Sequence, residues 1–276
     1  MDQELLGWGG EWLVWGFVAI LLFLGIPYVL APLIVGMTLR FRLPAEVVRV
    51  DPRQTPLPED VRMYFDQAYH ALVAQGFELL DVMYLPTVVP NVKSLLAVYV
   101  HRRAGDAAMS VFMMVDGPTT TMRKRHVEFV RRYEDGTLIQ TNNSDELGAF
   151  PRKPREFTTQ FPGLEDLQRL YALHRFMAQK QGGQGPPVLR IDREFGGNAC
   201  EYVARVALDE TLRDQIQTGY LTGDQVLRPT MRGALIMSWQ ELWPAKALRQ
   251  ARRRRAADAV LREFTAAQGG VAVGRG

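Results

Sequence analysis

The side chains best suited to chemistry are four histidines and one cysteine, and their spacing does not bring them together. They are His70, His101, His126, His174 and Cys200. No two histidines are three or four residues apart, the spacing that places two ligands on one face of a helix, and a zinc site needs three or four converging ligands. His101 and His126 could meet across neighbouring strands. We nevertheless expect ordinary histidines, no metal and no other cofactor.

The chain also lacks the short motifs of nucleotide binding and nucleophilic catalysis. It contains no G-x-S-x-G, G-x-x-x-x-G-K-[ST], G-x-G-x-x-G or H-E-x-x-H sequence, each of which carries a defined mechanism. One cysteine cannot form an intrachain disulfide, which agrees with a reducing compartment. We therefore assign no catalytic residue and favour a non-enzymatic binding module. A membrane-bound enzyme of unknown reaction stays an alternative.

The densest group of charges lies near the C-terminus, and it predicts contact with lipid. Two tryptophans precede a cluster of six basic residues without an acid, and the set is Trp239, Trp243, Lys246, Arg249, Arg252, Arg253, Arg254 and Arg255. Four consecutive arginines, 100° apart on a helix, cover all its sides, so this segment is not buried. Tryptophans followed by basic residues are typical of a helix lying on an anionic leaflet. The alternative is a core helix with a solvated, charged end.

An uncharged stretch near the N-terminus would hold these residues at a membrane. The segment 12–39 contains no charged residue, and a bilayer core of about 30 Å needs about 20 helical residues. The sequence therefore predicts a single transmembrane helix that two prolines would kink. Its marker residues are Trp12, Leu22, Pro27, Pro32 and Leu39.

The charges that flank this stretch predict its direction. Only acidic residues precede it, whereas Arg40, Arg42 and Arg49 follow it. Because Lys and Arg near a membrane stay on the cytoplasmic side, we expect the N-terminus outside and the large C-terminal part in the cytoplasm. The expected location is the inner or plasma membrane, with one pass.

Proline and glycine divide the chain into six parts. The expected parts are an N-terminal tail and anchor at 1–43, a Pro-rich linker at 44–58, an α+β domain at 59–181, a Gly/Pro linker at 182–187, a helical region with the basic cluster at 188–267, and a disordered tail at 268–276. Such compositions favour linkers and frayed ends over packed elements.

The fold class follows from apolar runs separated by short turns. We expect strands at 77–85, 92–102, 107–115, 122–133 and 137–141, with a weaker one at 155–161. Short turns make consecutive strands antiparallel, so the prediction is an antiparallel sheet of about five strands. Segments 95–100 and 107–115 are apolar on both faces, which places them near its centre. Helices at 59–75 and 164–179 would cover the sheet, giving an α+β fold with a helical C-terminal extension.

One further stretch resembles a known motif. The sequence GYLTGDQVLRPTMRG at 219–233 resembles the wing and following helix of winged-helix DNA-binding domains. This resemblance implies a tethered nucleic-acid binder. The preceding segment 209–214 is mostly acidic, however, where a recognition helix needs a basic face, so we do not expect nucleic acid as a partner.

The combined expectation is a single-pass, membrane-anchored protein with a cytoplasmic binding module. Its partner would be the lipid bilayer, anionic lipid headgroups or a protein at the membrane surface. A deep pocket with converging ionisable groups would instead favour the enzyme.

Overall fold

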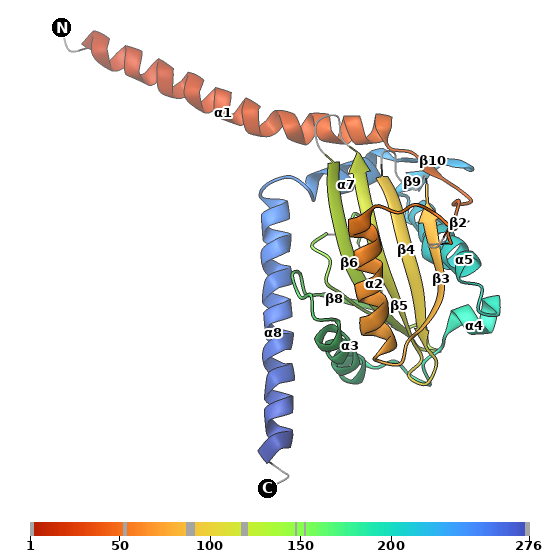
Figure 1. Ribbon diagram of the computed structural model, residues 1–276. Coiled ribbons are helices and arrows are strands. Elements are labelled where there is room, and N and C mark those ends of the chain that lie inside the picture. Colours follow the sequence, from red (N-terminus) through yellow and green to blue (C-terminus); the bar gives the residue numbers. More distant parts are fainter. Residues whose placement is uncertain are drawn as a thin grey trace.

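The computed structural model describes the backbone of residues 3–51, 54–86, 92–116, 121–146, 148–151 and 153–273. Side chains 3–13, 17, 20–22, 24, 116, 121 and 269–273 also lie outside the description. The described chain forms an α+β fold, in which helices cover a large sheet and one long helix extends away from it (Figure 1).

The main sheet has seven strands in the order β2-β3-β4-β5-β6-β7-β8. The strands are β2 (Val48–Arg49), β3 (Glu78–Leu85), β4 (Val92–His101), β5 (Asp106–Asp116), β6 (Thr121–Arg132), β7 (Leu138–Asn142) and β8 (Glu156–Gln160). All neighbours are antiparallel except β7 and β8, which are parallel. The strands predicted as central, β4 and β5, occupy the middle of the sheet.

The prediction of about five antiparallel strands needs two corrections. Strand β2 comes from the range expected as a linker, where Val48 pairs with Tyr84. Strand β8 runs parallel to β7 because the connection between them, residues 143–155, is long enough to return the chain to the same end of the sheet. The sheet is therefore larger than expected, and mixed.

Helices cover both faces of this sheet because its central strands are apolar on both sides. Helices α2 (Glu59–Val73), α3 (Leu167–Gln181) and α8 (Ala245–Val273) share one core cluster with Tyr99 and Phe129. The opposite face packs Val98 and Val100 against α4 (Arg190–Phe195), α5 (Ala199–Tyr202) and the π-helical η1 (Val203–Glu210). Alternate residues of β4 thus enter different cores.

A second, three-stranded sheet joins the segment after α1 to the last third of the chain. It contains β1 (Phe41–Arg42), β10 (Val226–Pro229) and β9 (Leu221–Thr222), in that order. Helix α6 (Thr211–Gln217) precedes it and α7 (Met231–Trp239) follows it. Strands β9 and β10 form a hairpin within the stretch that resembles a wing. Thr230 caps α7, because its hydroxyl accepts a hydrogen bond from Gly233 N at 3.1 Å.

Helix α1 (Gln3–Thr38) contains the stretch predicted to cross the membrane. None of the helices, over the residues described, combines the length and apolar character that a bilayer crossing needs. The side chains of Trp12 and Leu22, two markers of the predicted span, lie outside the described residues.

Helix α8 continues to Val273, into the range 268–276 for which we expected disorder, and residues 274–276 are outside the described part.

A buried ion pair joins β5 and β6 beneath α3, and two side chains of α3 contact its carboxylate. The Asp106 side chain is fully buried and accepts hydrogen bonds from Arg131 Nε at 2.6 Å and from the Tyr171 hydroxyl at 2.7 Å. His174, also fully buried, places its Nε2 3.5 Å from Asp106 Oδ1. Burial opposes ionisation of Asp106, but His174 and Arg131 outweigh it and lower the pKa of this carboxyl to about 2.

Removing this carboxylate should destabilise the fold in a pH-dependent way. At pH 7 we expect Asp106→Asn to lower the free energy of unfolding by about 3 kcal/mol, since Arg131 then loses its buried partner. The folded-state pKa lies below the ordinary value of 3.8, so this stability is present above pH 4 and is lost as the pH falls toward 2.

Urea unfolding of wild type and variant at pH 7, 5 and 3 tests this prediction. The difference between the two proteins should be largest at pH 7 and smallest at pH 3. Asp224→Asn, in an exposed turn, is the control and should leave stability nearly unchanged. A constant Asp106→Asn deficit across the pH range would contradict the assignment.

Candidate functional site

The two tryptophans predicted to contact lipid lie against the middle of α1. Trp239 Nε1 donates a hydrogen bond to the Tyr28 carbonyl at 2.8 Å, and the Tyr28 hydroxyl donates to the Trp243 carbonyl. The rings of Tyr28 and Trp239 are 6.4 Å apart. Helix α7 packs beside the C-terminal half of α1, where a Cβ on Gly36 would lie 3.8 Å from Ala234 Cβ. The sequence did not predict this contact.

Much of the described α1 surface is apolar and exposed. Phe23 is 78% exposed, Val29 63% and Met37 67%, far more than large apolar side chains of a core. Of the other predicted span residues, Pro27 is exposed, Pro32 is buried and Leu39 is half-buried. Leu39 packs with Phe41 and Leu227 at the base of α1. Large exposed apolar surfaces mark contact with lipid or protein.

The predicted basic residues follow α7 on α8, and two of them face the domain. Arg249 Nη2 donates to the Gly148 carbonyl at 2.7 Å, and Arg253 Nη1 donates to the Asp145 carbonyl at 2.8 Å. Ala257, Val260 and Phe264 continue the same side of α8 into the core. This side of the helix is therefore packed on the domain.

Other arginines of α8 point away from the domain. Arg255 precedes the buried Phe264 by nine residues, and Arg262 follows the half-buried Arg253 by nine. Nine residues correspond to about two and a half helical turns, so each arginine lies on the opposite side of the helix. Both are exposed, as are Arg252 and Arg254 on the flanks. Lys246 instead pairs with Glu241 at 2.9 Å. The four consecutive arginines thus divide among several directions.

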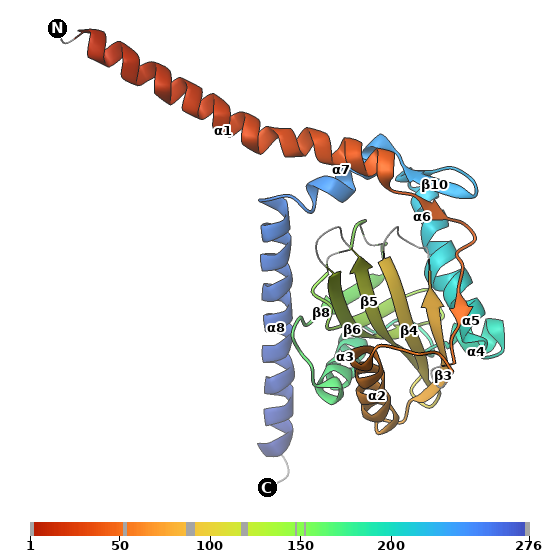
Figure 2. The same ribbon diagram turned by 45° about the horizontal axis from the view of Figure 1, so that its top comes forward.

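Helix α8 runs across the direction of α1, as two views of the structure show. Figure 1 shows α8 at the margin of the domain, running across the direction of α1, while the N-terminal half of α1 extends beyond that margin. Figure 2 repeats this arrangement after rotation. The outer face of α8 therefore lies on the side of the domain toward which α1 projects.

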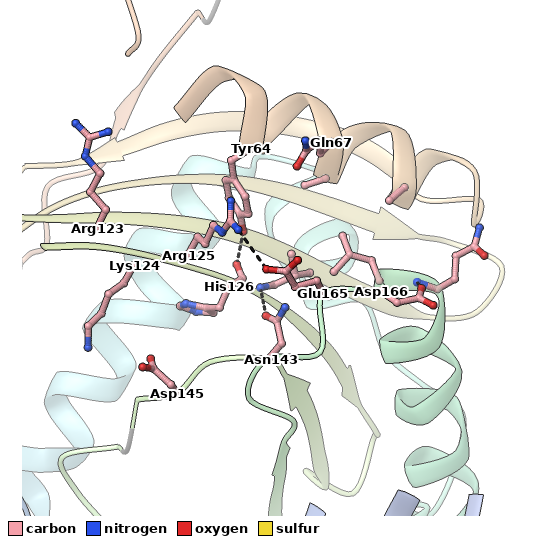
Figure 3. Close-up of a pocket in the computed structure, with 16 residues that line it drawn as sticks. Tyr64, Gln67, Arg123, Lys124, Arg125, His126, Asn143, Asp145, Glu165 and Asp166 are labelled. Atoms are coloured by element: carbon pink, nitrogen blue, oxygen red, sulfur yellow. Dashed lines mark hydrogen bonds and ion pairs between the residues drawn. The ribbon is translucent and has the colours of Figure 1, made fainter. Parts of the chain in front are cut away.

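A separate pocket of about 650 Å³ lies between α2, β6 and the start of α3 (Figure 3). Tyr64 forms one wall, and its hydroxyl donates to the His126 carbonyl at 2.6 Å. Charged and polar side chains surround the opening. They are Gln67, Arg123, Lys124, Arg125, Asp145, Glu165, Asp166 and Gln168.

The cations of this pocket already have acidic partners. Arg125 Nη2 lies 3.2 Å from Glu165 Oε1, and further ion pairs join Arg123 to Asp60 and Lys124 to Glu146. Burial lowers the pKa of His126, so the imidazole is neutral at pH 7. Because the charges compensate one another, the pocket favours a neutral or zwitterionic occupant over an anion.

The histidines do not assemble a metal centre. His101 of β4 pairs with Asp106 of β5, which in turn pairs with Arg131 of β6. His126 lies on β6 five residues before Arg131, so it is not in line with His101. His174 is in the core and bonds Thr141 at 3.1 Å. Across the described part of the chain, no three His, Cys, Asp or Glu residues are grouped to hold a metal ion.

Comparison with protein-family models, with curated proteins and with solved structures gave no match. The conclusions about function therefore depend on the residues and geometry described above.

The close approach of α7 to the small sheet can be tested with a pair of glycines. A Cβ on Gly233 would lie 2.0 Å from the Tyr220 carbonyl oxygen, whereas a Cβ on Gly36 would make an ordinary contact at 3.8 Å. Gly233→Ala should therefore destabilise the purified full chain by about 1–3 kcal/mol. Gly36→Ala should be neutral or slightly stabilising, because alanine is the better helix former. Thermal unfolding followed by circular dichroism measures both, and equal effects would contradict this packing of α7.

Proposed function

We propose that this protein is a membrane-anchored, non-enzymatic binding module that holds its α+β domain against an anionic membrane surface. Helix α1 would span the inner or plasma membrane once, with the domain in the cytoplasm. The outer face of α8 would then lie on the leaflet. The observation that carries the proposal is the direction of α8, which runs across α1 with Arg255 and Arg262 facing away from the domain.

The anchor is supported by the length and composition of α1. Its backbone rises about 30 Å between Trp8 and Tyr28, at 1.5 Å per residue, which is about the thickness of a hydrocarbon core. Tyr28, Trp239 and Trp243 meet at one end of this interval. Aromatic side chains that combine an apolar ring with a polar group favour the headgroup level.

The lipid contact is supported by the exposed cations of α8. Leu248 is 55% exposed on the same side as Arg255 and Arg262. The exposed Asp258 lies beside the two arginines, so this face combines an apolar residue with a net positive charge. Each basic residue near an anionic leaflet contributes about 1 kcal/mol. Two arginines, together with α1 as the membrane anchor, would suffice to orient the domain.

A catalytic role is the weaker alternative. The pocket of Figure 3 contains converging ionisable residues, but its three basic side chains are neutralised by Asp60, Glu146 and Glu165. A general acid or base needs a group whose pKa is shifted toward neutrality. Burial lowers the pKa of His126, which is away from neutrality, and we assign this residue no reaction.

The proposed anchor predicts the behaviour of the full chain in cells. The protein should stay in the membrane pellet after extraction with alkaline carbonate, because about 20 apolar residues would be buried in lipid. A reporter fused to the C-terminus should be active in the cytoplasm. Recovery in the supernatant would contradict the anchor, and activity only outside would contradict the orientation.

The proposed lipid contact can be tested with a fluorescent label on α8. In a Cys200→Ser background, Ala266→Cys places an environment-sensitive dye on the exposed side that carries Arg255 and Arg262. The full chain is placed in nanodiscs of neutral or anionic lipid. We expect a blue shift of emission in anionic discs, which weakens as salt screens the charges.

Variants of equal charge separate a specific contact from general attraction. Arg255→Gln with Arg262→Gln should abolish the shift, since about 2 kcal/mol of attraction is lost. Arg193→Gln with Arg205→Gln, on helices of the opposite sheet face, should retain it. Identical emission in neutral and anionic discs would refute the lipid contact while leaving the anchor intact.

A further inference from the structure

A groove of about 840 Å³ lies between α8 and the edge of the main sheet, on the side of α8 that faces the domain. Strand β8 is the last strand in the sheet order and supplies Thr158, Thr159 and Gln160 to one wall. Helix α8 supplies Arg249, Arg252, Arg253, Ala256, Ala257 and Val260 to the other. This groove uses different arginines from the outer, lipid-facing side of the helix.

The groove is strongly cationic. Three arginines line it, and none of the described residues around it is acidic. This distinguishes it from the pocket of Figure 3, where acidic side chains neutralise the cations. Glu241 lies 4.0 Å from Arg249 Nη1, beyond hydrogen-bonding distance, and it also pairs with Lys246.

Two of the arginines have buried N–H groups without an acceptor. Arg249 Nη1 and Arg253 Nε are inaccessible and make no hydrogen bond in the structure. Their remaining contacts are to the carbonyls of Gly148, Asp145 and Glu146, which hold the guanidinium groups in place but do not neutralise them. A buried donor without an acceptor is costly, so the two guanidinium groups are incompletely satisfied within the protein, as is the buried Gln181 Oε1 of the same groove.

The electrostatics of Arg253 agree with this reading. Burial lowers the pKa of its guanidinium, and the nearby Asp145 only partly opposes this effect. The group stays charged at pH 7 because its ordinary pKa is 12.5. It is a partly desolvated cation, and its interaction with an anion is therefore stronger than that of a solvated surface arginine.

We infer that this groove binds a phosphate ester, with the phosphate between Arg249, Arg252 and Arg253. Planar guanidinium groups match the oxygens of phosphate geometrically and can bond them in pairs. The other lining residues fit an organic portion of the ligand, because Phe150, Met177 and Val260 give part of the groove an apolar wall. The inference goes beyond the proposed function and does not depend on it, since the groove faces the domain.

Calorimetric titration of the full chain in neutral detergent tests the groove with two probes. They are glycerol 3-phosphate and a short-chain phosphatidylglycerol, which share the phosphate ester. We expect saturable binding of at least one. Tighter binding of the lipid would identify a lipid headgroup as the source of the phosphate, and tighter binding of glycerol 3-phosphate would identify a soluble ester.

Substitutions in α8 locate the binding. Arg252→Gln should weaken it about tenfold, and Ala256→Glu should abolish it by placing a negative charge in the groove. Arg252 and Ala256 are exposed residues of the groove wall, so both variants should fold, as checked by thermal unfolding. Arg254→Gln and Ala266→Glu, matched changes on other sides of α8, should leave affinity unchanged.

Two results would overturn the inference. One is the absence of saturable binding of both probes at millimolar concentration. The other is an equal loss of affinity in Ala256→Glu and Ala266→Glu, because binding would then follow the overall charge of the helix and not the groove. Neither result affects the label experiment on the outer face, so the two proposals fail independently.

Discussion

The packing of α7 on the C-terminal half of α1 is the contact on which the arrangement of the protein depends. It joins the segment after the small hairpin to the long apolar helix through Trp239, Tyr28 and Gly36. Strand β1 pairs with β10 directly beside it. Without these contacts, a flexible segment after α1 would leave the domain free to rotate relative to the helix. With them, the direction of α1 determines which side of the domain faces the membrane in the proposed arrangement.

The basic helix α8 illustrates how neighbouring arginines acquire different roles. Arg253 is held by loop carbonyls and lines the groove, whereas Arg255, two residues later, faces away from the domain. The difference arises from 200° of helical rotation. A cation in a partly desolvated groove interacts more strongly with an anion than a cation in water does. The exposed arginine can instead reorient toward the mobile headgroups of a lipid surface. The proposed phosphate site and the proposed lipid face are thus formed by one short sequence.

The local pattern of the sequence predicted most of the fold. Apolar runs separated by short turns predicted six of the strands. The pairing of β2 and the parallel addition of β8 were missed, because register and direction depend on contacts between distant segments. For the same reason the sequence did not reveal that Asp106 and Arg131 pair beneath α3, or that Arg249 and Arg253 bond the carbonyls of Gly148 and Asp145. Helical spacing indicated that the arginines diverge, but not which of them would face a cavity.

The joining of the first and last thirds of the chain has a consequence for its synthesis. Tyr28 and Trp239 are 211 residues apart in sequence. At about 5–20 residues per second, roughly 10–40 s separate the emergence of α1 from the ribosome and the arrival of its packing partner. During this interval the segment that follows α1 has no strand to pair with, and its apolar residues are available to chaperones. A nascent chain interrupted before β10 would keep this segment exposed, so proteolytic quality control could recognise incomplete copies at the point where they leave α1.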